Sequence, residues 1–292
     1  MDDRWDFPLI ADVFRPVQVD RNVVRFGAPH LGGAGVPTRL FGGQTLSAIQ
    51  LSVQILHPKC HVLSIRSNFV APGLTNVLVK CVVDQVPQTP FLNVSVCQKN
   101  RIIATARVKI GLKDDLLSIV FIQVPIVKSP FTYPSVAHHI NNLDDSTNHK
   151  FLRKLVKWDL FEMRPTDLSQ FFMKSKEIGP LIVWCRLAQS QRNIEFPKNS
   201  GNAVLAMLTD YWTMNSPVEN FERYFKENPN FPASLNHNIT FYDSENVDPV
   251  GWFLVETECN VHASNHFLMK GHIFDESRKC LVSFEQEGYM AG

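Results

Sequence analysis

The two halves of the chain follow the same order of elements, and this repeat restricts the possible folds more than any other feature. Each half reads as a strand, a loop, a strongly apolar helix and then four strands joined by short turns. The helices begin at glycines 158 residues apart, Gly43 and Gly201, whereas the last strands match at an offset of 178. A period this long indicates two duplicated units rather than a stack of small repeats.

The second helix is apolar on almost every face. Between Gly201 and Trp212, large apolar side chains recur at helical spacing, and alanines and Met207 occupy most remaining positions. A helix of this kind has to be buried. An antiparallel sheet can bury it by curling round it. The sequence therefore predicts an α+β double hotdog: two repeats joined edge to edge, each with an antiparallel sheet wrapped round a long apolar helix.

The pattern divides the chain into four segments. We expect an irregular lead-in over residues 1–20, an N-terminal hotdog over 21–113, a linker over 114–150 and a C-terminal hotdog over 151–292. The linker is predicted because its prolines and the polar run 141–149 interrupt the alternation of the strands.

Composition excludes several classes of function. The chain has 29 Lys and Arg against 28 Asp and Glu, so it carries no charge excess suited to nucleic acid or a membrane surface. No apolar run is long enough to span a membrane. Its cysteines form no C-x-x-C pair and its histidines have no metal-site spacing, so we expect neither a metal nor a cofactor. Without a signal peptide or a terminal Ser-Lys-Leu, a cytoplasmic or peroxisomal location is expected.

Polar differences between the repeats point to one site per chain. Asp210 lies near the C-terminal end of the second helix, where a carboxylate opposes the helix dipole. The corresponding residue of the first half is Ser52, and Gln286 corresponds to Val108. A buried carboxylate is costly unless it is hydrogen-bonded, so Asp210 is either chemical or part of a structural network. Gln286 either joins it or faces solvent at a strand end.

Several motifs in order resemble the type II acyl-CoA thioesterases, which include bacterial thioesterase II and animal peroxisomal acyl-CoA thioesterases. They are Phe41-Gly-Gly-Gln44, the run from Ser64 to Gly73, Glu162-Met-Arg-Pro165, Trp184-Cys-Arg186, Leu208-Thr-Asp210, Ser234-Leu-Asn-His-Asn238 and Gln286-Glu-Gly288. The resemblance implies an acyl-CoA substrate, a homo-oligomer and a water-activating group formed by Asp210, Ser234 and Gln286.

These residue types suit direct hydrolysis of a thioester. A carboxylate can take a proton from water, while a hydroxyl and an amide fix the water's orientation. The chain has no G-x-S-x-G nucleophile elbow. Backbone N–H groups at the start of a buried helix would stabilise the oxyanion. Arg186 and Lys270 are possible ligands of the coenzyme A phosphates.

Departures from the family pattern keep one alternative open, and a histidine beside the site residues keeps a second. Asn236 and Asn238 stand where the family has Asp and Ser, and Leu63 and Arg66 stand where it has His. One alternative is a catalytically weak acyl-CoA-binding paralogue of the same fold. The other is a hydratase or dehydratase that pairs a histidine with a carboxylate, for which His237 is the nearest candidate.

Overall fold

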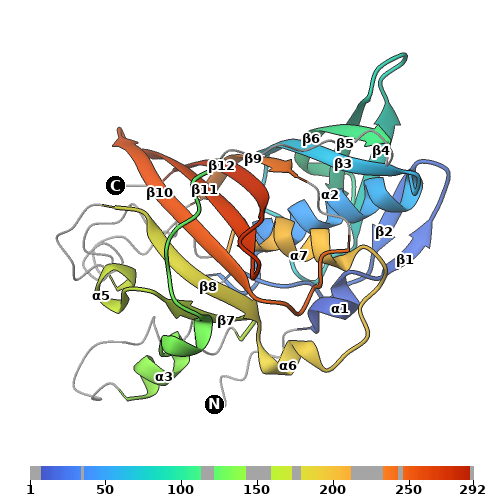
Figure 1. The fold of residues 1–292 in the computed structure, drawn as a ribbon. Helices are drawn as coiled ribbons and strands as arrows, with labels where there is room; N and C mark the ends of the chain where they lie inside the picture. The colour runs from blue at the N-terminus through green and yellow to red at the C-terminus, as the bar shows by residue number, and fades with distance from the viewer. Residues whose placement is uncertain are drawn as a thin grey trace.

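The strands form one antiparallel sheet that curls over two helices (Figure 1). The computed structural model describes residues 8–33, 36–112, 122–142, 159–172, 179–211, 233–242 and 246–289. Within these ranges the sheet has twelve strands in the order β1-β2-β4-β5-β6-β3-β9-β12-β11-β10-β8-β7. No helix among the described residues is long and apolar enough to cross a membrane.

Apart from two elements near the N-terminus, the first half has the order that the sequence predicts: one strand, a long helix and four strands. They are α1 (Ile10–Val13), β1 (Pro16–Val19), β2 (Val23–Phe26), α2 (Gly42–Leu56), β3 (Cys60–Phe69), β4 (Val79–Gln85), β5 (Phe91–Gln98) and β6 (Arg101–Leu112). Between the halves lie η2 (Pro130–Thr132) and α3 (Val136–Asn141).

The second half repeats this order with two additional short helices. Its elements are β7 (Phe161–Pro165), α5 (Leu168–Phe171), β8 (Leu181–Leu187), α6 (Gln189–Arg192), α7 (Ser200–Leu208), β9 (Ala233–Phe241), β10 (Phe253–Ala263), β11 (His266–Asp275) and β12 (Cys280–Tyr289).

The strand order confirms the predicted double hotdog. Read outward from the centre, β3-β6-β5-β4-β2-β1 on one side mirrors β9-β12-β11-β10-β8-β7 on the other. The two repeats join where β3 pairs antiparallel with β9. Because hydrogen bonds continue across this seam, the two predicted sheets form one continuous surface.

A β-bulge at the same place in each repeat fixes how the repeats correspond. The pairing of β3 with β6 skips Leu63, and the pairing of β9 with β12 skips Leu235, 172 residues later. A bulge reverses the alternation of side chains along its strand. It therefore lets Val62 in β3 and Ser234 in β9 face the helices although the bulged leucines interrupt the pattern.

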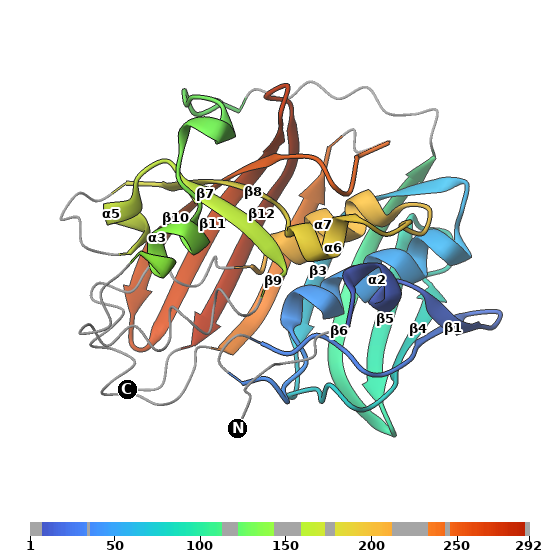
Figure 2. The ribbon, with the colours of Figure 1, turned by 90° about the horizontal axis from the view of Figure 1, so that it is seen from below.

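The two long helices pack against each other in opposite directions (Figure 2). Ser47 in α2 donates a hydrogen bond of 2.6 Å to the carbonyl of Ala203 in α7. One turn earlier in α2, a Cβ on Gly43 would lie 2.6 Å from the carbonyl oxygen of Met207. The start of α2 therefore lies against the end of α7, which is where Asp210 follows.

Residues 8–20 differ from the expected irregular lead-in. They contain α1 and the edge strand β1, and Ile10 and Phe14 are fully buried. The backbone N–H of Ile10 donates to the side chain of Gln191 at 2.8 Å. The sequence did not predict these elements because α1 and β1 have only four residues each, too few for a periodic apolar pattern.

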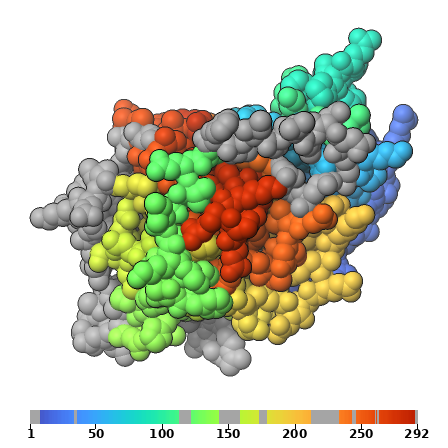
Figure 3. All heavy atoms as spheres, viewed as in Figure 1, coloured from blue at the N-terminus to red at the C-terminus, as the bar shows by residue number. Residues whose placement is uncertain are grey.

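The described part of the predicted linker covers the outer face of the second half. Ile122, Val124 and Val127 pack against a cluster that contains Trp184 and Trp252. Figure 3 shows this segment, in green, against the strands of the second half. Residues 114–121 and 143–150 of the predicted linker lie outside the described residues, as does Trp212 at the end of the predicted second helix. The domain boundaries stay a prediction.

Candidate functional site

Asp210 reaches the start of the helix in the other repeat. Its own helix ends at Leu208, and the carboxylate accepts a hydrogen bond from the backbone N–H of Gly43 in α2. A Cβ on Gly42 would lie 2.5 Å from Asp210 Oδ2, so only glycine permits this approach. The expected opposition to a helix dipole is therefore offset, because the N-terminus of α2 carries a partial positive charge that attracts the carboxylate.

The fold brings the three predicted site residues into one hydrogen-bonded group. The Gln286 side-chain amide donates to Asp210 Oδ1 at 2.6 Å and to Ser234 Oγ at 2.8 Å. Ser234 Oγ lies 3.4 Å from the same Asp210 oxygen. Gln286 is fully buried, so it does not face solvent at the strand end.

Each of the three comes from a different element. Asp210 follows α7, Ser234 lies in β9 and Gln286 lies in the neighbouring β12. Ser234 faces this group because the bulge at Leu235 reverses the alternation of β9. Without the bulge, a strand that points His237 inward would point Ser234 outward.

Burial raises the pKa of Asp210 to about 7. Hydrogen bonds from Gln286, Gly43 and Ser234 and the positive charge of Arg39 act in the opposite direction and keep the pKa from rising further. Near neutral pH both protonation states are populated. That is the range in which a carboxylate serves best as a general base.

A histidine lies directly beside this group. His237 is fully buried, its ring stacks on Phe284 with centroids 6.0 Å apart, and its Nδ1 lies 3.9 Å from Asp210 Oδ1. That separation is too long for a direct hydrogen bond. Burial lowers the pKa of His237 to about 3, so the ring is neutral at physiological pH. The sequence indicated this residue only for the hydratase alternative.

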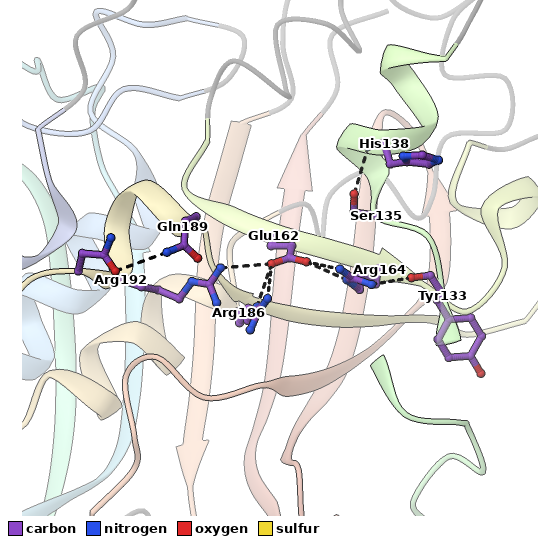
Figure 4. Close-up of polar contacts among 9 residues, drawn as sticks. Tyr133, Ser135, His138, Glu162, Arg164, Arg186, Gln189 and Arg192 are labelled. Carbon is purple, nitrogen blue, oxygen red and sulfur yellow. Dashed lines mark hydrogen bonds and ion pairs between the residues drawn. The ribbon is translucent and has the colours of Figure 1, made fainter. Parts of the chain in front are cut away.

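The basic residues suggested by the sequence for coenzyme A are held in ion pairs. Arg186 lies 2.8 Å from Glu162, which also pairs with Arg164 at 2.7 Å (Figure 4). Lys270 lies 2.5 Å from Glu258. By contrast, Arg39 precedes α2 and acts on the Asp210 pKa. The sequence did not single out Arg39, because nothing local reveals its proximity to a residue of the other repeat.

The first repeat has no comparable group at the corresponding positions. By the register of the two bulges, Val62 and Ile65 correspond to Ser234 and His237. Val108, which pairs with Ile65, corresponds to Gln286, which pairs with His237. All three residues of the first repeat are buried. The polar group therefore belongs to the second repeat.

In the described part of the chain, no three His, Cys, Asp or Glu side chains are grouped as metal ligands would be.

Comparison with protein families gives a match over the repeat that carries this group. Residues 158–290 match the acyl-CoA thioesterase C-terminal domain. The matched residues run from just before β7 to the end of β12 and include Asp210, Ser234 and Gln286. No curated protein matches the chain in sequence.

Solved structures are similar over nearly the whole chain. An acyl-CoA thioesterase II, TesB2, from Mycobacterium marinum is 16% identical, has a TM-score of 0.71 and covers 97% of this chain and 98% of its own. A putative thioesterase II from Thermobifida fusca is 13% identical, with a TM-score of 0.70 and coverages of 96% and 98%. The dehydratase domain of RzxB from Pseudomonas fluorescens is 10% identical, with a TM-score of 0.55 and coverages of 95% and 97%. At these identities the likeness shows the shared hotdog fold.

The raised pKa of Asp210 predicts that the free energy of unfolding falls as pH rises from about 4 to about 7. An aspartate that has a pKa of 3.8 when unfolded and about 7 when folded contributes nothing below the lower value. As pH rises through this window the unfolded chain ionises first, so Asp210 increasingly destabilises the fold, and the loss levels off above about 7. Asp210→Asn should therefore gain stability over the wild type between pH about 4 and about 7.

Urea denaturation of both proteins across this range measures the difference. Asp12→Asn, at an exposed aspartate of α1, controls for the loss of one carboxylate and should show a much smaller change. A constant difference between wild type and Asp210→Asn across the range would contradict the raised pKa.

Proposed function

We propose that the chain hydrolyses fatty acyl-CoA thioesters to free fatty acid and coenzyme A by direct attack of an activated water. The observation that carries the proposal is the contact of Asp210, Ser234 and Gln286 at the start of α2. All three residues lie in the repeat that matches the acyl-CoA thioesterase C-terminal domain.

In this mechanism Asp210 is the general base. Its carboxylate takes a proton from the water as the oxygen attacks the thioester carbonyl carbon. Gln286 holds the carboxylate in place with a short, charge-assisted hydrogen bond of 2.6 Å. Ser234 supplies a hydroxyl 2.8 Å from the same amide, which orients the water's remaining hydrogen or lone pair.

The carbonyl oxygen becomes negative when the water adds. Backbone N–H groups in the first turn of α2 are unpaired within the helix and point along its positive end. We expect those beside Gly43 to stabilise the oxyanion. When the tetrahedral adduct collapses, the carbon–sulfur bond breaks and the coenzyme A thiolate takes the proton that Asp210 removed from water.

Two other functions, acyl-CoA binding and hydration, can be distinguished from hydrolysis by measurement. A catalytically weak paralogue would bind acyl-CoA without releasing free thiol. A hydratase is favoured by one observation, the separation of 3.9 Å between His237 and Asp210, because such enzymes pair these two side chains. Consumption of an enoyl-CoA double bond without thiol release would identify that activity.

A homo-oligomer and a cytoplasmic or peroxisomal location stay predictions.

Free-thiol release from short, medium and long acyl-CoA substrates tests the proposal. We expect wild-type turnover on at least one chain length, and we expect Asp210→Asn to lower kcat by about a hundredfold or more while it remains folded. Ser52→Ala, at the corresponding position of the first repeat, is the matched control and should stay within a few-fold of wild type. No release by wild type at any chain length would favour the binding paralogue.

Ser234 and Gln286 should behave as a unit. Gln286 holds both Asp210 and Ser234 through its amide, so removing either Gln286 or Ser234 releases the same water, and removing the second costs little more. Ser234→Ala and Gln286→Ala should each lower kcat, and the double variant should match the worse single variant. Ser234→Thr keeps the hydroxyl and should remain active. Losses that add fully in the double variant would assign the two residues separate roles.

A further inference from the structure

His237 is a buried polar side chain for which the hydrogen bonds of the structure do not account. Its exposed fraction is zero, and within the described residues neither ring nitrogen has a hydrogen-bond partner. A neutral imidazole carries one donor and one acceptor. A buried donor or acceptor without a partner lowers the free energy of unfolding, so a ring that served only to fill space would be more stable without these nitrogens.

The fold does not need a polar side chain at this position. The corresponding residue of the first repeat is Ile65, which is fully buried and pairs with Val108 as His237 pairs with Gln286. An aliphatic residue therefore satisfies the same register, the same strand and the same layer of the core. The imidazole is present only in the repeat that carries Asp210.

The ring faces the reactive oxygen of the site. His237 Nδ1 lies 3.9 Å from Asp210 Oδ1, and that oxygen also accepts the hydrogen bond from Gln286. Oδ2, by contrast, lies against Gly42 at the start of α2. Water bound to Oδ1 would therefore lie within hydrogen-bonding reach of Nδ1 as well, because one water can bridge two polar atoms at this separation.

We propose that His237 is a fourth member of the water-activating group and holds the attacking water jointly with Asp210. Either tautomer serves: Nδ1–H donates to the water oxygen, or unprotonated Nδ1 accepts the water's second hydrogen. The inference rests on the proposed hydrolysis and adds a residue to it. The ring transfers no proton, because it stays neutral while Asp210 acts as the base.

The test compares His237→Phe with Ser67→Ala. Phenylalanine keeps the shape of the ring and its stacking on Phe284 but removes both nitrogens. Ser67 donates a hydrogen bond of 2.8 Å to the His237 backbone carbonyl from β3, so its loss disturbs the same position without touching the imidazole. His237→Gln restores a polar side chain.

The proposal predicts opposite effects on stability and turnover. His237→Phe should keep or raise the urea midpoint and lower kcat by about tenfold or more, the usual scale for one hydrogen bond to a charged or reacting group. Ser67→Ala should lower the midpoint and leave kcat within a few-fold. His237→Gln should recover part of the lost turnover. Wild-type kcat in a folded His237→Phe protein overturns the inference.

A second readout is independent of turnover. Among the described residues, the charged side chain that acts on Asp210 is Arg39, from the loop before α2, and the titratable ring of His237, from β9, lies 3.9 Å from its carboxylate. Carboxyl NMR of Asp210 should give a titration midpoint that rises by about half a pH unit or more in His237→Phe, because the bridging water no longer stabilises the carboxylate. If wild type hydrolyses no acyl-CoA, the proposed function fails, and an unchanged midpoint then overturns this inference separately.

Discussion

The hydrogen bond between the Asp210 carboxylate and the start of α2 connects the main features of this structure. It joins the end of one repeat's helix to the beginning of the other's, and it requires both the antiparallel packing of α2 on α7 and the absence of a side chain at Gly42. The same contact places a buried carboxyl where a helix terminus partly offsets its charge. Burial still dominates, and the pKa rises to about 7. A carboxyl in this state is unfavourable for stability and favourable for proton transfer at neutral pH.

Duplication explains why only one such site is present in the described chain. The bulges at Leu63 and Leu235 show that the two repeats keep the same backbone irregularity, so the backbone could serve a site in either. What differs is the side chains at matched positions, with Val62, Ile65 and Val108 in one repeat and Ser234, His237 and Gln286 in the other. The first repeat supplies a helix start and a supporting sheet, and the second supplies the polar group. The proposed site therefore needs both repeats of the fold.

Much of the fold could be predicted from sequence because the signals were periodic. The apolar run of the first helix and the alternation over residues 91–98 predict α2 and β5 to within two residues, whereas the second helix ends earlier than predicted, at Leu208. The repeat predicts the order of the elements. What sequence could not predict depended on contacts between distant segments. The packing of Ile122 on Trp184, the anchoring of Ile10 by Gln191 and the approach of Arg39 to Asp210 leave no local pattern. Comparison of the repeats singled out Gln286, and the family resemblance added Ser234. The bulge that turns Ser234 toward the helices became visible only in the strand register.

The central claim is that Asp210 activates a water rather than attacking the thioester itself. A single turnover in heavy-oxygen water, with the protein in excess over an acyl-CoA, tests by mass spectrometry for a covalent route in which water attacks the Asp210 carbon of an anhydride. Direct attack predicts that the released fatty acid carries one heavy oxygen and that the peptide containing Asp210 carries none. A fatty acid containing only ordinary oxygen, together with a heavy oxygen in the Asp210 carboxyl, would show a covalent anhydride intermediate and would contradict the account.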